Sequence, residues 1–208
     1  MGIPFWAARG RTVDLLDLKP HDVPPEVLAE TLAKLNRFSG RTDQPWSVAA
    51  HSVLVERLCP PDLGPWALLH DAHEAFIGDI TSPAVDYIAH VGRIPGLHQA
   101  IATAKGRVDR AIGSAWGVAV RSVSQDLRRA DRIALQAEAI LFLDAKPVLF
   151  EPHDDEDIDR ALSILREMPV SGDWRVAREL WLAQVERYSQ LGSMTPPGAI
   201  DPVCIPQT

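Results

Sequence analysis

Cysteine is scarce in this sequence. Its 208 residues include only Cys59 and Cys204, which lie far apart, and no CxxC pair occurs. Small disulfide-stabilised domains carry several closely spaced cysteines, so the chain shows no sign of a disulfide framework. This cysteine usage favours a protein of the reducing cytoplasm.

Long apolar runs and an excess of basic residues are also missing. No run approaches the length of a membrane span, and the N-terminus lacks the charged-then-apolar pattern of a signal peptide. Lysine and arginine number 21 against 28 aspartates and glutamates, a net charge of −7. A general nucleic-acid binder would present a basic face, so we expect neither nucleic acid nor a membrane as partner. Small anionic substrates stay compatible with the chain if basic side chains converge locally.

What is present is the composition of a globular protein, with 46% hydrophobic and 24% charged residues. The length suits one substantial domain better than two. We place that domain at residues 1–191. The four prolines that follow Thr195 indicate a separate tail over 192–208.

Apolar periodicity predicts an all-α fold with one small β-hairpin near the N-terminus. The hairpin is expected within residues 1–19, and residues 80–83 are expected to form a proline-punctuated loop. The predicted helices cover residues 25–35, 48–58, 68–77, 97–116, 124–141, 154–165 and 174–191. Their stop and start signals include Ser47 and Ser124 as N-caps and Gly78 as a C-terminal cap.

The stretch from Leu68 to Pro83 concentrates ionisable residues on an otherwise apolar helix. His70, Asp71, His73 and Glu74 all fall within it. Burying such groups is costly unless something compensates them, most simply a cation. Glu74 stands one helical turn beyond both His70 and Asp71, so this segment is predicted to form one wall of a metal site.

Further ligands must come from other segments. His51 lies on the apolar stripe of residues 48–58, where a lone histidine is more often a satisfied core residue than a ligand. Asp131 and Glu138 lie near the buried stripe of residues 124–141, and an acid in such a position needs a counter-charge.

The order of these residues resembles that of the HD-domain metal-dependent phosphohydrolases, in which a histidine, a His-Asp pair and an aspartate follow one another on successive helices. The segments SVAAHS (47–52), LHDAHE (69–74) and GDITSP (78–83) look like those of small bacterial 5'-deoxynucleotidases and phage-type dATP triphosphohydrolases. Gly10-Arg11, Asp14-Leu15-Leu16 and Arg37-Phe38 also resemble this short-chain branch. The resemblance covers about residues 5–145 and implies an HD-type helical bundle.

The resemblance implies one divalent cation held by His51, His70, Asp71 and Asp131. A mixed nitrogen and oxygen donor set suits Mn, Fe, Co, Ni or Zn, and Mg less comfortably. Glu74 and Asp79 match the family's residues that orient or deprotonate the attacking water or help to bind a second ion. Their alternative roles are a solvated helix residue and the cap of a turn.

Arg37 matches the family's phosphate-contacting arginine, and Phe38 stands where relatives often carry tryptophan against base or sugar. A core phenylalanine is the alternative for Phe38. Many relatives have a lysine after Ser-Pro, whereas this chain reads Ala84-Val85-Asp86. That phosphate contact is missing here or is supplied by Lys105, Arg93 or Arg107. His73 is expected to be an exposed helix residue and not a ligand.

The expected function is hydrolysis of (2'-deoxy)nucleoside 5'-phosphates, with dATP triphosphohydrolase favoured on resemblance alone. The alternatives are a 5'-deoxynucleotidase that acts on monophosphates and a nucleotide-binding module without turnover. No HExxH, no GxxxxGK[ST] and no nucleophile elbow occurs, so water is expected to attack directly. A small-molecule nucleotide is the expected partner, in a cytoplasmic homo-oligomer.

Overall fold

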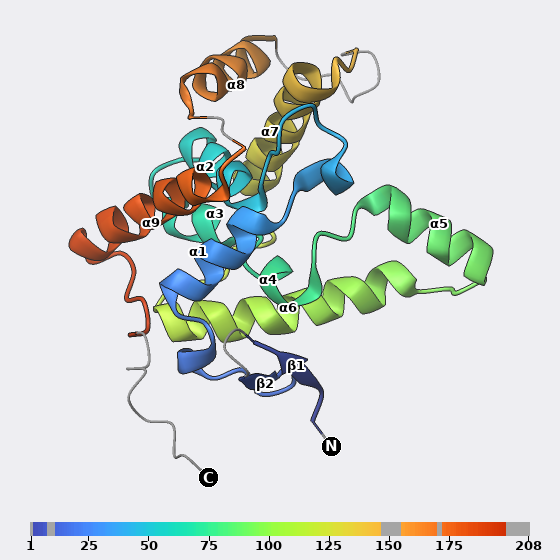
Figure 1. Cartoon of the computed structure of the whole chain (residues 1–208), viewed down its shortest axis with the longest axis vertical. Coiled ribbons are helices and arrows are strands. Elements are labelled where there is room, and N and C mark those ends of the chain that lie inside the picture. Colours follow the sequence, from blue (N-terminus) through green and yellow to red (C-terminus); the bar gives the residue numbers. More distant parts are fainter. Residues whose placement is uncertain (1, 8–10, 147–154, 170–171, 199–208) are drawn as a thin grey trace.

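The computed structural model describes residues 2–7, 11–146, 155–169 and 172–198, and the chain is mostly helical there. The predicted all-α class with a small β-hairpin is confirmed (Figure 1). In chain order the elements are β1 (Pro4–Trp6), β2 (Thr12–Asp14), η2 (Pro20–Asp22), α1 (Pro25–Lys34), η3 (Arg37–Gly40), α2 (Val48–Leu58), α3 (Gly64–Leu69), α4 (Glu74–Ile77), α5 (Ser82–Gly92), α6 (Leu97–Trp116), α7 (Gln125–Leu143), α8 (Asp155–Glu167) and α9 (Trp174–Gln190). None of the helices in the described part of the chain is long and apolar enough to cross a membrane.

Helix α2 is the centre of the bundle. It packs against α1, α3, α7, α8 and α9, and its residues from Val48 to Glu56 are all buried (Figure 1). Ser47 begins it as predicted, because its hydroxyl oxygen accepts a hydrogen bond from the Ala50 amide at 3.2 Å. A helix surrounded in this way holds its side chains in fixed positions, and His51 lies on it.

Two tryptophans fix the segment that leads to the His-Asp pair. The rings of Trp116 and Trp181 meet edge to face with centroids 5.8 Å apart, and both are fully buried. Trp181 Nε1 donates to the Leu68 carbonyl at 3.2 Å, and Trp116 Nε1 donates to the Val23 carbonyl at 2.9 Å. The end of α3 is therefore tied to α9, only two residues before His70.

The N-terminal hairpin contacts α4 through one aromatic pair. β1 and β2 pair antiparallel with Phe5 opposite Val13, as the sequence predicts for residues 1–19. The Phe5 ring lies 6.2 Å from the Phe76 ring, centroid to centroid. The hairpin, which lies below α6 in Figure 1, thus packs through Phe5 against the helix that begins at Glu74.

The single helix predicted over residues 68–77 is wrong. The chain ends α3 at Leu69, turns through residues 70–73 and starts α4 at Glu74. Backbone bonds here span three residues instead of four, as from the Glu74 amide to the Asp71 carbonyl at 2.9 Å. This tighter turn redirects the two side chains of the His-Asp pair, and Gly78 ends α4 with a φ of 83°.

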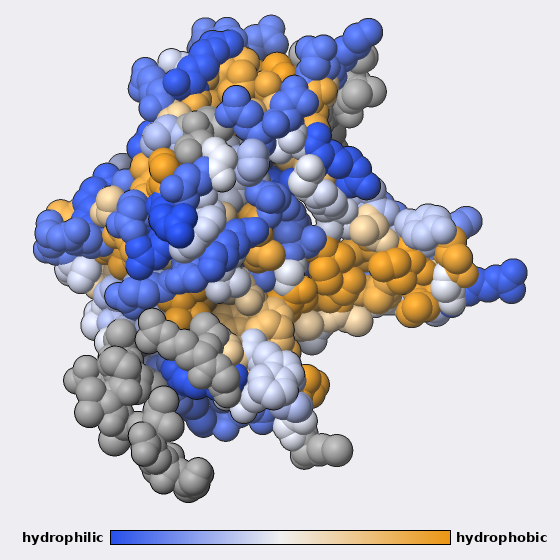
Figure 2. Space-filling model, viewed as in Figure 1, coloured by the Kyte–Doolittle hydropathy of each residue, from blue (hydrophilic) through white to orange (hydrophobic). Residues whose placement is uncertain are grey.

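The loop predicted over residues 80–83 is confirmed for residues 80 and 81 and wrong for the other two, because α5 begins at Ser82 with Pro83 in its first turn. Helix α5 and the first half of α6 project from the bundle as an arm (Figure 1). Its apolar side chains Tyr87, Ile88, Val91 and Ile94 are exposed, and Figure 2 shows the orange surface that they give the arm. No helix was predicted over residues 82–92, because apolar side chains that do not face the core give no clear pattern of a buried helix face.

Gly78 allows a test of this local geometry. Its φ of 83° and ψ of 163° lie in a region that is essentially restricted to glycine, although a Cβ atom there would meet nothing within 4 Å. We expect Gly78→Ala to lower the free energy of unfolding by about 1–3 kcal/mol through backbone strain alone. Chemical denaturation measures this. Gly198→Ala is the control, since that site is equally open without a positive φ, and an equal effect of both substitutions would contradict the account.

Candidate metal centre

Four side chains from α2, α7 and the turn between α3 and α4 converge at one point. His51 Nε2 lies 3.2 Å from Asp131 Oδ1 and 3.6 Å from Asp71 Oδ2. His70 Nε2 lies 3.2 Å from Asp71 Oδ2 and 3.9 Å from Asp131 Oδ1. The four residues that the resemblance implies as ligands are therefore brought together, although they span 80 positions of the sequence, from 51 to 131.

Each imidazole is oriented through its other nitrogen. His51 Nδ1 lies 2.7 Å from Glu138 Oε1, and His70 Nδ1 lies 2.7 Å from the Ala67 carbonyl oxygen. A carboxylate or carbonyl in this place fixes the ring and leaves Nε2 free for a metal. Both Nε2 atoms are buried and form no hydrogen bond within the described residues. Two such nitrogens facing two carboxylates can hold a divalent cation, and borderline transition ions suit this donor set.

The electrostatics of the centre show an excess of negative charge. Burial lowers the pKa of His51, but the carboxylates of Glu138 and Asp131 outweigh it and raise the pKa to about 10. Burial, together with the charges of Asp71 and Asp79, raises the pKa of Glu74 to about 9. Both groups thus take up a proton where a cation is absent, which is the behaviour of a site that needs positive charge.

Glu138 is a functional residue that the sequence analysis did not assign to the site. It is completely buried, holds His51 and accepts a hydrogen bond from Arg37 Nε at 2.9 Å. Its spacing of seven residues from Asp131, two helical turns on the same face of α7, was the available signal. The expected counter-charge for this acid is Arg37, whose Nη1 also lies 3.9 Å from Asp71 Oδ2.

Glu74 and Asp79 lie beside the four converging side chains. Glu74 is buried, and its Oε2 has no hydrogen-bond partner within the described residues. Burial and the nearby Asp71 charge raise the pKa of Asp79, against the opposing effect of Arg37. Lys105, one of the three candidates for the missing phosphate contact, lies next to this pair of acids, with Nζ 3.8 Å from Glu74 Oε1.

Arg93 and Arg107 are the other two candidates for the missing phosphate contact. Arg93 lies at the end of α5 and Arg107 near the middle of α6, and both are exposed. Phe38 is half-buried with a φ of 54°, and its ring centre lies 5.6 Å from the Arg37 guanidinium carbon. Phe38 packs against the core and borders the centre through Arg37 at the same time, so the geometry accommodates both of its predicted roles.

The expectation of an exposed His73 is wrong. Its side chain is 6% exposed, and Nδ1 lies 2.9 Å from Asp109 Oδ1 on α6. The turn at residues 70–73 points it inward, where a continuous helix would have carried it elsewhere. Ligand atoms of Asp71, His73 and Glu74 lie within 4.8 Å of one another, so this second group could also hold a cation.

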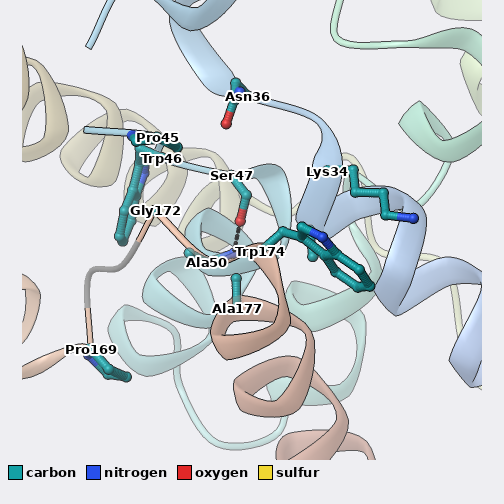
Figure 3. Close-up of a pocket in the computed structure, with 11 residues that line it drawn as sticks. Lys34, Asn36, Pro45, Trp46, Ser47, Ala50, Pro169, Gly172, Trp174 and Ala177 are labelled. Atoms are coloured by element: carbon teal, nitrogen blue, oxygen red, sulfur yellow. Dashed lines mark hydrogen bonds between the residues drawn. The ribbon is translucent and has the colours of Figure 1, made fainter. Parts of the chain in front are cut away.

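Two cavities lie near these elements. A recess of about 450 Å³ between α6 and α7 has His70 and Asp131 at one end. A smaller cavity of about 180 Å³, shown in Figure 3, lies among α1, the start of α2 and α9, and is lined by Trp46, Ser47 and Trp174. It shares no lining residue with the metal centre, and the Lys34 ammonium 4.3 Å above the Trp174 ring helps to close it.

Comparison with known proteins leaves the family open. No family model matches the chain. An uncharacterized protein of Rhodobacter capsulatus is 46% identical over 83 residues, which cover 36% of this chain and 42% of that protein. The uncharacterized protein YfdR of Escherichia coli is 39% identical over 62 residues, which cover 30% of this chain and 35% of YfdR. Each match spans less than half the length of the relative, and neither name describes an activity.

Removing one ligand tests the metal centre directly. Asp131→Ala deletes a carboxylate on which both histidines converge, so we expect the metal content after Mn²⁺ loading and desalting to fall below a tenth of the wild-type value. Asp126→Ala, an exposed acid on the same helix, is the control. Elemental analysis measures the bound metal, and circular dichroism verifies the fold. Full metal content in the Asp131 variant would refute the assignment.

The raised pKa of His51 predicts proton-linked metal binding. In the metal-free protein His51 stays protonated below about pH 10, and a metal can bind only to the deprotonated Nε2. Binding therefore releases a proton, and the Mn²⁺ affinity rises by roughly tenfold per pH unit between pH 6 and 8. Calorimetry in buffers of different ionisation enthalpy counts the released protons, and a count of zero would contradict this interpretation.

Proposed function

We propose that this protein is a metal-dependent phosphohydrolase that acts on (2'-deoxy)nucleoside 5'-phosphates. The observation that carries the proposal is the convergence of two buried imidazole nitrogens, which form no hydrogen bond within the described residues, with two carboxylates beside Arg37 and Lys105. Structural histidines in a core have satisfied nitrogens, and structural carboxylates do not gather around them without a cation. This combination supports a catalytic centre over a purely structural role.

The residues present fit the parts that phosphoester hydrolysis needs. A divalent cation held by His51, His70, Asp71 and Asp131 supplies polarisation of a phosphoryl oxygen and acidification of a bound water. Glu74 presents an unpartnered buried oxygen one turn from this point, so it is placed to orient a water and to accept its proton. Asp79 lies close enough to Glu74 to raise its pKa, and it shares this proton-accepting environment.

Arg37 and Lys105 supply the fixed positive charge for a phosphate group. The pKa of Arg37 is raised by the surrounding carboxylates, so it stays charged although burial opposes this. Its Nε is held by Glu138, which leaves the terminal nitrogens directed toward Asp71 and the centre. Lys105 takes the place of the lysine that relatives carry after Ser-Pro, from a different helix.

Within this class we favour a dATP triphosphohydrolase, on the resemblance to the phage-type branch, over a 5'-deoxynucleotidase. The Mn²⁺- or Co²⁺-loaded protein should be incubated with dATP, dAMP and ATP, with Asp131→Ala as the inactive control. Triphosphate release from dATP supports the first activity, and inorganic phosphate from dAMP supports the second. Nucleotide binding without turnover would favour the binding module, and neither binding nor turnover with Mn, Co, Fe, Ni, Zn or Mg would overturn the proposal.

Arg37→Ala should raise KM for the nucleotide by about tenfold, because a charged hydrogen bond to phosphate is worth roughly 1.5–3 kcal/mol. Arg37→Lys keeps the charge but not the planar fork, so an intermediate KM is expected. Steady-state kinetics at saturating metal measure both. Arg41→Ala, which removes an exposed arginine four residues away, is the control, and a wild-type KM in the Arg37→Ala variant would count against the phosphate contact.

A further inference from the structure

The recess between α6 and α7 adjoins the metal centre, because His70 and Asp131 are part of its lining. The rest of its lining combines apolar side chains with polar and charged ones. The apolar side chains are Ala102, Val120, Val123 and Leu127, and the polar or charged ones are His73, Lys105, Asp109, Arg110, Ser122 and Arg128. Val123 is 79% exposed and Val120 is 37% exposed, so these walls leave apolar surface uncovered. A volume of about 450 Å³ is that of a small-molecule site.

In the lining of this recess, His73 provides a nitrogen atom that has no hydrogen-bond partner among the described residues. It lines the recess beside His70. Its Nδ1 is 2.9 Å from the buried Asp109 carboxylate, and its Nε2 is buried without a hydrogen-bond partner in the described residues. An Nδ1–H donated to Asp109 leaves Nε2 as the acceptor of the neutral ring. A buried acceptor without a partner is costly, so a ligand that satisfies it gains affinity.

We propose that this recess holds the nucleoside part of the substrate and that His73 Nε2 accepts a hydrogen bond from an O–H or N–H group of that nucleoside. The inference rests on the proposed function, because it places the phosphate at the metal centre and directs the remainder of the molecule into the recess. Asp109 is a positioning residue, because its carboxylate sets the tautomer and the orientation of His73.

The apolar side chains Val120 and Val123 favour the nucleoside over a phosphate chain at the positions next to them. A flat base or a sugar face covers the apolar surface of Val120 and Val123, whereas a phosphate placed there would lose hydration without gaining a donor from these side chains. An acceptor nitrogen also repels phosphate oxygens. Arg110 and Arg128 line the same recess and give it the positive charge that an anionic ligand meets on entry.

The test compares His73→Phe and His73→Gln with His98→Phe. His98 forms a similar pair with Asp86, with Nε2 3.0 Å from the carboxylate, but it is exposed on the arm outside the recess. We expect His73→Phe to raise KM for the deoxyadenosine nucleotide by about tenfold, the value of one lost hydrogen bond at a buried acceptor. His73→Gln keeps a polar atom near Nε2 and should recover most of this loss. His98→Phe should stay within about twofold of the wild type, as expected for an exposed residue.

Substrate analogues identify the donor. Outside its phosphates a deoxyadenosine nucleotide has two donor groups, the 3'-hydroxyl and the 6-amino group. One analogue lacks the 3'-hydroxyl and the other lacks the 6-amino group. With the analogue that lacks the group that His73 contacts, wild type and His73→Phe should have the same KM. With the other analogue, the KM of His73→Phe should stay about tenfold above that of the wild type. If the difference persists with both analogues, His73 does not contact the nucleoside and the inference is overturned.

Two further readouts separate the inference from the proposed function. Elemental analysis should show the same metal content in wild type and His73→Phe, and a loss of metal together with nucleotide affinity would make His73 a cation ligand instead. Hydrolysis of p-nitrophenyl phosphate reports on the metal centre alone. Wild-type turnover of this ester without turnover of any nucleotide would refute the nucleotide substrate, whereas nucleotide turnover with an unchanged KM in His73→Phe would refute only the role of His73.

Discussion

The hydrogen bond between His51 on α2 and Glu138 on α7 is the interaction on which the rest of this structure depends. Both side chains are completely buried, and neither charge would be tolerated there alone. Arg37 completes the group by pairing with Glu138. This group joins the central helix α2 to α7 and to the segment after α1. The same contacts therefore hold the helices together and fix the orientation of the His51 ring.

This constraint determines what the centre can do. His51 cannot turn Nε2 away from Asp131 without breaking its bond to Glu138, and His70 is held in the same way by a backbone carbonyl. The ligands are therefore preorganised, and a cation that binds them does not need to order flexible side chains. His73 is also held in place before a ligand binds, because Asp109 on α6 orients its ring.

Local signals in the sequence were sufficient for the helices of the bundle and for the candidate ligands. Ser47, Ser124 and Gly78 cap helices as their residue types predict. The spacing of ionisable residues singled out His70 and Asp71 as candidate ligands. The burial of His73 was not predictable, because its ring pairs with Asp109, 36 positions later in the chain. The break at residues 70–73 was not predictable either, since neither glycine nor proline occurs there. Helix α5 was not predicted, because several of its apolar side chains are exposed. The usual inference from apolar spacing to a buried helix face therefore does not apply to it.

A crystal structure of the Mn²⁺-loaded protein, with the ion located by anomalous scattering, tests the central claim most directly. The account predicts an ion bound by His51 Nε2, His70 Nε2 and oxygen atoms of Asp71 and Asp131, at distances of about 2.0–2.3 Å. His51 Nδ1 should keep its hydrogen bond to Glu138 in that structure. An ion bound elsewhere, or four side chains that turn away from one another without an ion between them, would contradict the account.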